Sequence, residues 1–256
     1  MKITSQKINN IAVDKIEYDF EGIKDYCYVE KGETDNYIVN FHGHGSNADQ
    51  LYTREDIFQS WYPAIKKRRL GIINFDTQGN GWMNKDVIFV TNQILQFLKK
   101  EYNIQKLIFS GGSMGGTSAL IYTIHHPEDA DGVIANCPVA NMTEYYHFLE
   151  KSQDLLLVEI RETIKERYKG TPEESSMYKD NNANEKSDIF TMPLYVCQAT
   201  GDQIIPCEWT LDLINKLKGQ PNFMYKIIDG GDHDSPLSHF EEELNWMCEK
   251  VFCKAK

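Results

Sequence analysis

The chain has no apolar segment long enough to cross a membrane. A transmembrane helix needs roughly 18 consecutive apolar residues, and no run in the sequence approaches that length. The first ten residues also contain no continuous apolar stretch, which argues against a secretory signal peptide. We therefore expect neither a membrane span nor a cleaved leader.

Cysteine is sparse and is not arranged in the pairs that bind zinc. None of the six cysteines forms a C-x-x-C motif, and two of them lie inside apolar, strand-like runs. Thiols in such positions are typical of a reducing compartment, so we expect a cytoplasmic protein without a structural zinc site. The six are Cys27, Cys137, Cys197, Cys207, Cys248 and Cys253.

Basic side chains are fewer than acidic ones. The chain has 27 basic and 38 acidic side chains, which gives a formal net charge of -11. Nucleic acids and anionic membranes would repel such a surface, so we expect neither as a partner. The apolar share of 41% and the length of 256 residues suit one globular domain with a large core, so we assign residues 1–256 to a single domain.

Strands and helices alternate along most of the chain. The first two predicted strands form an antiparallel hairpin, and the later ones are separated by helices, for example over 49–67 and 86–102. This alternation predicts an α/β fold with a mostly parallel sheet that carries helices on both faces. The eight predicted strands cover residues 15–20, 25–30, 37–41, 71–76, 106–110, 132–137, 194–198 and 223–228.

Residues 141–190 interrupt this alternation. The segment contains helical stretches at 145–149 and 155–168, a Gly-Thr-Pro stop and a polar tract rich in asparagine. It is too short to bury much core of its own. We predict a small helical insertion over the mouth of the active site, which we call the lid segment, and the alternative is an insertion without a role in function.

The most informative motif lies at Gly111-Gly112-Ser113-Met114-Gly115, directly after an apolar strand and before a helical pattern. A G-x-S-x-G sequence in this context is typical of the nucleophile elbow, in which a tight turn exposes a serine hydroxyl. Gly111 and Gly115 let the strand and the helix pass closely. We predict Ser113 as the nucleophile.

A serine nucleophile needs a base, and the base needs an acid. His233 follows the last predicted strand on a glycine-rich loop, and Asp202 follows the strand before it. Because the carboxyl ends of parallel strands share one edge of the sheet, we predict His233 as the base and Asp202 as its acid. His239 is the reserve base, and the alternative role for Asp202 is a helix cap. Asp232 and Asp234 remain alternative acids.

The chain order Ser, Asp, His is that of the α/β-hydrolases. On its motifs, which extend over most of the chain, the sequence resembles the α/β-hydrolase superfamily and within it the esterase and prolyl-oligopeptidase-like branch. The resemblance implies an α/β-hydrolase fold with an eight-stranded, mostly parallel sheet and a helical lid. The matching pieces are residues 42–45, 75–81, 111–116, 201–206 and 230–233. The branch usually has an arginine where Gln78 stands, which leaves the bracing of that loop open.

The resemblance also implies an oxyanion hole of two backbone N–H groups. The residue after the nucleophile, Met114, supplies one of them. The loop at residues 42–45 supplies the other, for which we predict His44 with Gly45 as the alternative.

Substrate contacts are predicted for four aromatic and imidazole side chains near these loops. Packing is the alternative role for them. They are His42, Trp82, Tyr145 and Tyr146.

These features together predict a serine hydrolase that cleaves a carboxylic ester of a small molecule, for which an acylated carbohydrate or an aromatic ester would suit the lid. A small peptidase, amidase or thioesterase would have the same motifs, and we prefer the ester because the chain lacks the propeller domain of prolyl oligopeptidases. We expect no cofactor and no metal, and the oligomeric state stays open, homo-oligomers included.

Two rival classes compete with this prediction. A zinc hydrolase could draw ligands from the imidazoles and carboxylates near the strand ends, although the acidic residue and histidine expected after the H-x-H pair are missing. A binding protein on a hydrolase scaffold is the non-enzymatic alternative. The candidate zinc ligands are His42, His44, Asp49, Asp76, Asp202 and His233.

Overall fold

Parallel strands form the centre of a mixed sheet in the computed structural model, which describes residues 1–252. Within these residues the sheet has nine strands in the order β1-β2-β3-β5-β4-β6-β7-β8-β9, and those from β5 to β9 are parallel. The strands are β1 (Lys2–Ile8), β2 (Ile11–Phe20), β3 (Ile23–Glu30), β4 (Asn36–Phe41), β5 (Gly71–Phe75), β6 (Lys106–Gly112), β7 (Gly132–Asn136), β8 (Leu194–Ala199) and β9 (Phe223–Ile228).

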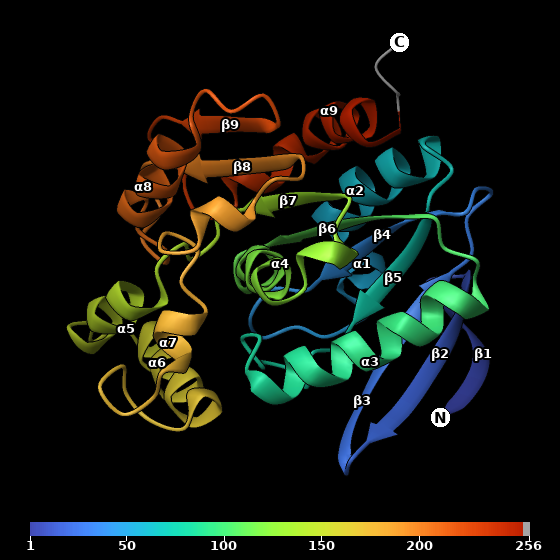
Figure 1. Ribbon diagram of the computed structural model, residues 1–256, viewed down its shortest axis with the longest axis horizontal. Coiled ribbons are helices and arrows are strands. Elements are labelled where there is room, and N and C mark those ends of the chain that lie inside the picture. Colours follow the sequence, from blue (N-terminus) through green and yellow to red (C-terminus); the bar gives the residue numbers. More distant parts are fainter. Residues whose placement is uncertain (253–256) are drawn as a thin grey trace.

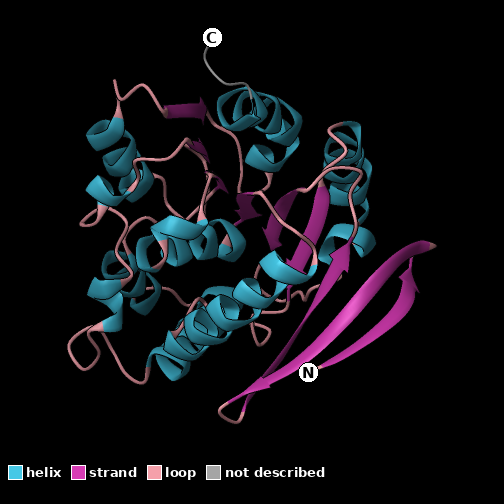
Figure 2. Cartoon of the chain, turned by 45° about the vertical axis from the view of Figure 1, so that its right-hand side comes forward, coloured by secondary structure: helices cyan, strands magenta, loops and turns pink. Residues whose placement is uncertain are grey.

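The prediction of eight strands is wrong by one. The additional strand, β1, pairs antiparallel with β2 at the edge of the sheet (Figure 2). Most of its side chains are exposed, so its sequence carries no apolar run that would reveal it. Backbone pairing with β2 holds it in place. Ser113 consequently follows the sixth strand of the chain and not the fifth.

Helices cover both faces of the sheet, as predicted. Buried side chains of α3, α4 and α8 form one apolar cluster with the sheet, and those of α1, α2 and α9 form a second cluster on the other face. Figure 1 shows α3 and α4 in front of the strands. These helices are α1 (Gln50–Thr53), α2 (Glu55–Lys67), α3 (Lys85–Glu101), α4 (Met114–His125), α8 (Glu208–Leu217) and α9 (Phe240–Phe252).

One predicted helix, over 49–67, is broken in two. Arg54 between α1 and α2 has an extended backbone, with φ -79° and ψ 113°. The sequence does not reveal the break, because residues 50–58 around it contain neither glycine nor proline. Arg54 lines the cavity that also contains Ser113.

The lid segment consists of three helices and a short 3-10 turn beside α4 (Figure 1). Its buried tyrosines, Tyr145, Tyr168 and Tyr178, belong to the same apolar cluster as α3 and α4. The segment is therefore packed onto the sheet layer through continuous core. Its elements are α5 (Met142–Glu150), α6 (Leu155–Tyr168), α7 (Met177–Asp180) and η2 (Ser187–Ile189).

Two further observations concern the helices and the thiols of the described chain. No helix within residues 1–252 has the length and apolar character needed to cross a bilayer. The five cysteines of this range form no disulfide with one another, and four of them are buried. The sixth, Cys253, lies outside the described residues.

Candidate active site

Ser113 sits on a tight turn between β6 and α4. Its backbone has φ 59° and ψ -125°. This conformation is strained for any residue that has a side chain. The turn closes because its glycines lack side chains. A Cβ on Gly111 would lie 2.4 Å from the carbonyl carbon of Gly115, and one on Gly115 would lie 2.1 Å from the Phe41 oxygen. The elbow predicted from the motif is therefore a close approach of three backbone segments.

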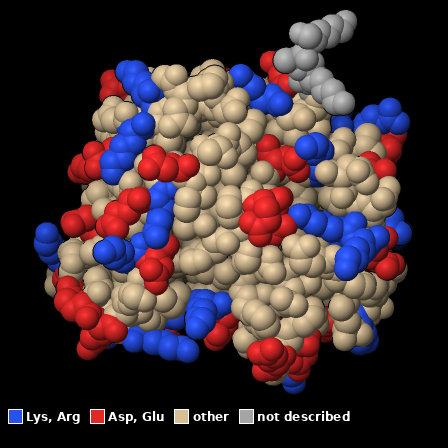
Figure 3. Space-filling model, in the orientation of Figure 1, with Lys and Arg blue, Asp and Glu red and all other residues tan. Residues whose placement is uncertain are grey.

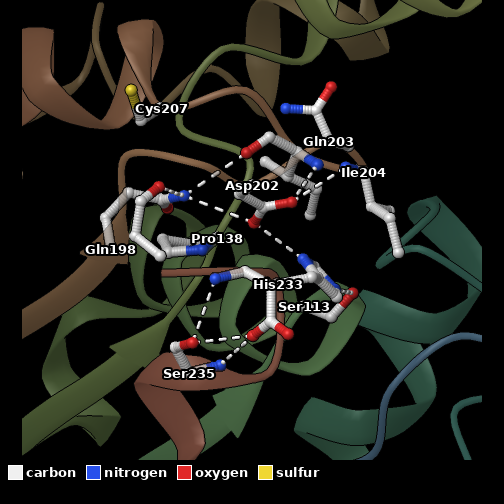
Figure 4. A network of polar contacts seen from close by, with 12 residues as sticks. Ser113, Pro138, Gln198, Asp202, Gln203, Ile204, Cys207, His233 and Ser235 are labelled. Atoms are coloured by element: carbon white, nitrogen blue, oxygen red, sulfur yellow. Dashed lines mark hydrogen bonds and ion pairs between the residues drawn. The ribbon is translucent and has the colours of Figure 1, made fainter. Parts of the chain in front are cut away.

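The loop after β9 brings an imidazole to this serine. Nε2 of His233 lies 2.9 Å from Oγ of Ser113, although 120 residues separate the two in sequence. Figure 4 shows the ring between Ser113 and the carboxylate of Asp202. The hydroxyl can donate its proton directly to this nitrogen.

The other ring nitrogen faces Asp202, whose side chain is completely buried. Nδ1 of His233 lies 2.7 Å from Oδ2 of Asp202. The second carboxylate oxygen accepts the backbone N–H groups of Ile204 and Ile205, at 2.8 and 2.9 Å. These two N–H groups fix the carboxylate, so that it holds the His233 ring with its proton on Nδ1.

The alternative acids and the reserve base are occupied elsewhere. Asp232 accepts from Ser235, at 2.6 Å from the hydroxyl, and Asp234 faces Arg54. His239 lies in η3 (Ser235–His239), where its Nδ1 is 3.8 Å from a carboxylate oxygen of Glu242. The structure thus brings together Ser113, His233 and Asp202 among the candidates.

Two backbone N–H groups stand free beside the serine. Within residues 1–252, the amides of His44 and Met114 have no hydrogen-bond partner. The neighbouring amides are taken, because Gly43 N–H donates to Oε1 of Gln50 at 3.0 Å and Gly45 N–H donates to Oδ1 of Asn80 at 2.7 Å. Of the two predicted alternatives in this loop, His44 keeps its donor available.

A cavity of about 210 Å³ opens at Ser113. Its remaining wall is largely apolar and comes from α2, the lid helix α6 and the loops after β8 and β9. His44 and His233 also line it, so the residue with the free amide borders the same cavity as the Ser113 hydroxyl and the His233 imidazole. The apolar side chains of the wall include Ile57, Trp61, Leu156, Ile160, Ile204 and Leu237.

The four side chains predicted to contact substrate do not line this cavity, which corrects that prediction. The ring of His42 is buried between the carbonyl oxygens of Gly43 and Asp76, at 2.8 and 2.6 Å. The other three are buried in the aromatic core that joins the lid segment to the loop before α3. They are Trp82, Tyr145 and Tyr146.

The wall residues that sequence reasoning missed come mainly from helices. Leu156 and Ile160 lie one turn apart on α6, and Ile57 and Trp61 lie one turn apart on α2. Each pair has ordinary helical spacing, which the sequence shares with any buried stripe. The run of three leucines at 155–157 was the signal in the sequence for an apolar surface there.

The residues proposed for a zinc site do not assemble. Across residues 1–252, the one trio of His, Cys, Asp or Glu side chains close enough to share an ion is His126, Glu128 and Asp129, far in sequence from the proposed set. Asp129 is already paired with Lys99, at 2.5 Å. Both ring nitrogens of His42 contact backbone carbonyl oxygens, so neither is available to a metal ion.

The surface charge is mixed on the face shown in Figure 3, where acidic and basic side chains alternate. Apart from its histidines, the acidic and basic side chains that line the cavity are Arg54 and Asp234. Arg54 pairs with both Asp234 and Asp56, at 3.1 and 2.8 Å, so its positive charge is balanced locally. The cavity therefore offers an apolar wall without an uncompensated cation.

Comparison with solved structures shows which proteins share the fold of this chain. An S-formylglutathione hydrolase from Agrobacterium tumefaciens superposes with a TM-score of 0.71 at 14% identity, covering 98% of this chain and 100% of that one. Est1E from Butyrivibrio proteoclasticus gives 0.69 at 17% identity, covering 93% and 98%. An acylaminoacyl peptidase from Pyrococcus horikoshii gives 0.66 at 13% identity, covering all of this chain and 43% of that one.

These likenesses establish the α/β-hydrolase fold that the motifs had predicted. A search of curated protein sequences finds no match. The family model described as "Prolyl oligopeptidase family" matches residues 75–251, which is more than half of the chain and includes the elbow and the residues that meet it. The chain belongs to the prolyl oligopeptidase family.

Proposed function

We propose that this protein is a serine hydrolase that cleaves a carboxylic ester of a small molecule through an acyl-enzyme. One observation carries the proposal: Ser113, His233 and Asp202 form a continuous hydrogen-bonded line that ends at the cavity. This line has the arrangement that activates a hydroxyl in serine hydrolases.

In the first half of the reaction, Nε2 of His233 takes the proton of Ser113 as Oγ attacks the ester carbonyl. The free N–H groups of His44 and Met114 stabilise the negative charge that forms on the carbonyl oxygen. The bond to the alcohol then breaks, and the imidazolium returns the proton to the departing oxygen.

In the second half, water attacks the acyl-serine while His233 accepts one of its protons. The oxyanion is held as before, and collapse of the intermediate releases the carboxylic acid and restores the Ser113 hydroxyl. Asp202 keeps the proton on Nδ1 throughout and stabilises the imidazolium.

Because the cavity wall is largely apolar, we expect a substrate ester whose group next to Ser113 is apolar. A peptidase or amidase is the second candidate, because the family is that of prolyl oligopeptidase and an acylaminoacyl peptidase shares the fold. We propose further that residues 1–256 form one domain in which 141–190 acts as a lid, and that the enzyme works in the cytoplasm without metal or cofactor.

Labelling and substitution test this proposal together. A fluorophosphonate should modify the wild-type protein at Ser113, as peptide mapping would show. Ser113→Ala should abolish labelling and lower kcat by at least about 10⁴-fold, because the nucleophile is lost. Ser238→Ala, a change of an exposed serine of η3, is the matched control. Labelling at another residue, or near-normal turnover by Ser113→Ala, would refute the assignment.

Substrate panels separate the two candidates. Nitrophenyl esters with acyl chains of graded length and aminoacyl anilides should be compared by kcat/KM on the same preparation. The ester proposal expects turnover of the esters and little turnover of the anilides. Preferential cleavage of the anilides would instead establish the peptidase.

A further inference from the structure

The imidazole of His44, whose backbone N–H we propose as an oxyanion donor, is held by both of its ring nitrogens. Nδ1 lies 3.1 Å from Nε1 of Trp82. An indole N–H can only donate, so Nδ1 must accept and the ring proton of neutral His44 lies on Nε2. Trp82, which does not reach the cavity, therefore selects the tautomer of His44.

The protonated nitrogen faces a carboxylate from the lid segment. Nε2 of His44 lies 2.5 Å from Oε2 of Glu159 on α6, although 115 residues separate the two in sequence. The Asn80 amide lies 3.4 Å from the same nitrogen, and the shorter contact decides where the N–H points. The side chain of His44 is 6% exposed and that of Glu159 is 53% exposed, so the contact joins a nearly buried imidazole to a half-exposed carboxylate.

Glu159 is itself oriented by its own helix. Oγ1 of Thr163, one turn further along α6, donates to Oε1 of Glu159 at 3.2 Å. The two carboxylate oxygens thus have separate partners, one on α6 and one on the loop after β4. A carboxylate held in this way has fewer rotamers to lose when it binds the imidazole.

The same helix braces the loop that carries Asn80 and Trp82. Nη2 of Arg167 donates to the carbonyl of Gln78 at 3.1 Å, and the hydroxyl of Tyr168 donates to the carbonyl of Trp82 at 2.9 Å. This loop needs bracing, because Gln78 and Trp82 both have positive φ, at 54° and 48°. The brace that the arginine of the related motif would give is thus supplied here from the lid segment.

We propose that Glu159 is a positioning residue that ties the lid segment to the oxyanion hole. It fixes the imidazole of His44, and with it the backbone N–H of the same residue, at the point where the carbonyl oxygen gains charge. The inference rests on the proposed function and extends it. The oxyanion donor of this protein is complete only when α6 is docked.

Substitution at Glu159 separates positioning from substrate binding. Glu159→Ala removes the acceptor of Nε2–H, so we expect kcat for a nitrophenyl ester to fall about 10-fold while KM changes less than twofold, since the contact acts on the transition state. Glu159→Gln keeps an oxygen acceptor and should recover part of the loss. Glu162→Ala, an exposed glutamate on the same helix that pairs with Arg161, is the matched control and should behave as wild type.

A spectroscopic readout distinguishes positioning from a general loss of stability. Nitrogen-15 chemical shifts of His44 should show the Nε2–H tautomer in the wild-type protein and a perturbed Nε2 resonance in Glu159→Ala. Trp82→Phe should allow the Nδ1–H tautomer to appear. Unchanged nitrogen shifts in Glu159→Ala would show that the two side chains do not interact in solution, which would overturn the inference.

The kinetic results test the proposed function and the positioning role of Glu159 separately. If Ser113→Ala remains active, the proposed function fails. If activity depends on Ser113 but Glu159→Ala keeps the wild-type kcat, or raises KM alone, the positioning role fails and the proposed function stands. Should Glu159→Ala unfold, Glu159→Gln and Thr163→Val still decide the question, because both retain the bulk of α6.

Discussion

Nη2 of Arg54 lies 3.1 Å from Oδ2 of Asp234, the residue that follows His233 in the chain. The same guanidinium binds Asp56 through two nitrogens, at 2.9 and 2.8 Å. Burial lowers the pKa of Arg54, but its bonds to Asp56 and the attraction of Asp234 outweigh this and raise the pKa above its usual value. A permanent cation at the break between α1 and α2 thus anchors the loop that carries the proposed base.

Breaking this anchor should slow the reaction modestly. Asp234→Asn removes the ion pair and should lower kcat about two- to fivefold, because a partly exposed pair contributes up to roughly 1 kcal/mol to the order of the loop. Steady-state kinetics on a nitrophenyl ester would measure the change. Asp56→Asn frees the other side of Arg54 without touching the loop, and it should leave kcat close to the wild-type value. Equal losses in both variants would contradict a role for the loop anchor.

The elbow offers a test of packing that does not depend on activity. Gly115→Ala would place a Cβ 2.1 Å from the Phe41 oxygen, so β4 or α4 must move. We expect the free energy of unfolding in urea to fall by about 3 kcal/mol, the upper end of the usual cost of overpacking.

Gly22→Ala is the control for this change. Gly22 has φ +84°, and a Cβ added there would have no atom within 4 Å, so the substitution costs about 1 kcal/mol of backbone strain alone. A loss at Gly115 no greater than that at Gly22 would mean that the strand and the helix are not in tight contact.

The sequence predicted the central sheet because its strands are apolar runs bounded by turns. Buried parallel strands such as β5 and β7 expose neither face, so their sequences are short, mostly apolar runs. The edge strand β1 is held by backbone pairing with β2. Backbone pairing does not require a particular pattern of side chains, so a polar sequence does not reveal it. The break at Arg54 was equally invisible, since contacts with residues distant in sequence stabilise it.

The proposed catalytic residues could be predicted because each follows a strand at the same edge of the sheet. Ser113, Asp202 and His233 each occupy a loop whose place the strand pattern fixes. The cavity wall could not be predicted in this way. Whether Tyr145 or Leu156 faces the cavity depends on how the lid segment packs, and helical spacing alone gives both the same chance of burial.

A buried carboxyl beneath the sheet should make stability depend on pH. Burial raises the pKa of Glu243 from 4.5 to about 8, although a hydrogen bond from Asn136 partly opposes this. The folded protein therefore keeps this proton between pH 4.5 and 8, whereas the unfolded chain releases it. Stability from this group is full below pH 4.5, decreases as the pH rises to about 8, and is constant above that.

Glu243→Gln should remove this dependence. The amide is neutral at every pH, so the decline of the unfolding free energy between pH 7 and 8, about 1 kcal/mol, should disappear. Asp25, whose pKa burial raises to about 7, should still cause a decline at lower pH. Urea unfolding at several pH values would show this. Glu242→Gln, an exposed neighbour, serves as control and should keep the wild-type decline above pH 7.

Two adjacent leucines at the start of α6 provide a matched test of the cavity wall. Leu156 lines the cavity and is 46% exposed, whereas Leu155 is 86% exposed and does not line it. Leu156→Ala should raise KM about fivefold for an ester with an apolar acyl chain, because roughly 1 kcal/mol of apolar contact is lost. The effect should shrink as the chain is shortened toward acetate. Leu155→Ala should leave KM unchanged, and a larger effect at Leu155 than at Leu156 would show that the substrate binds outside this cavity.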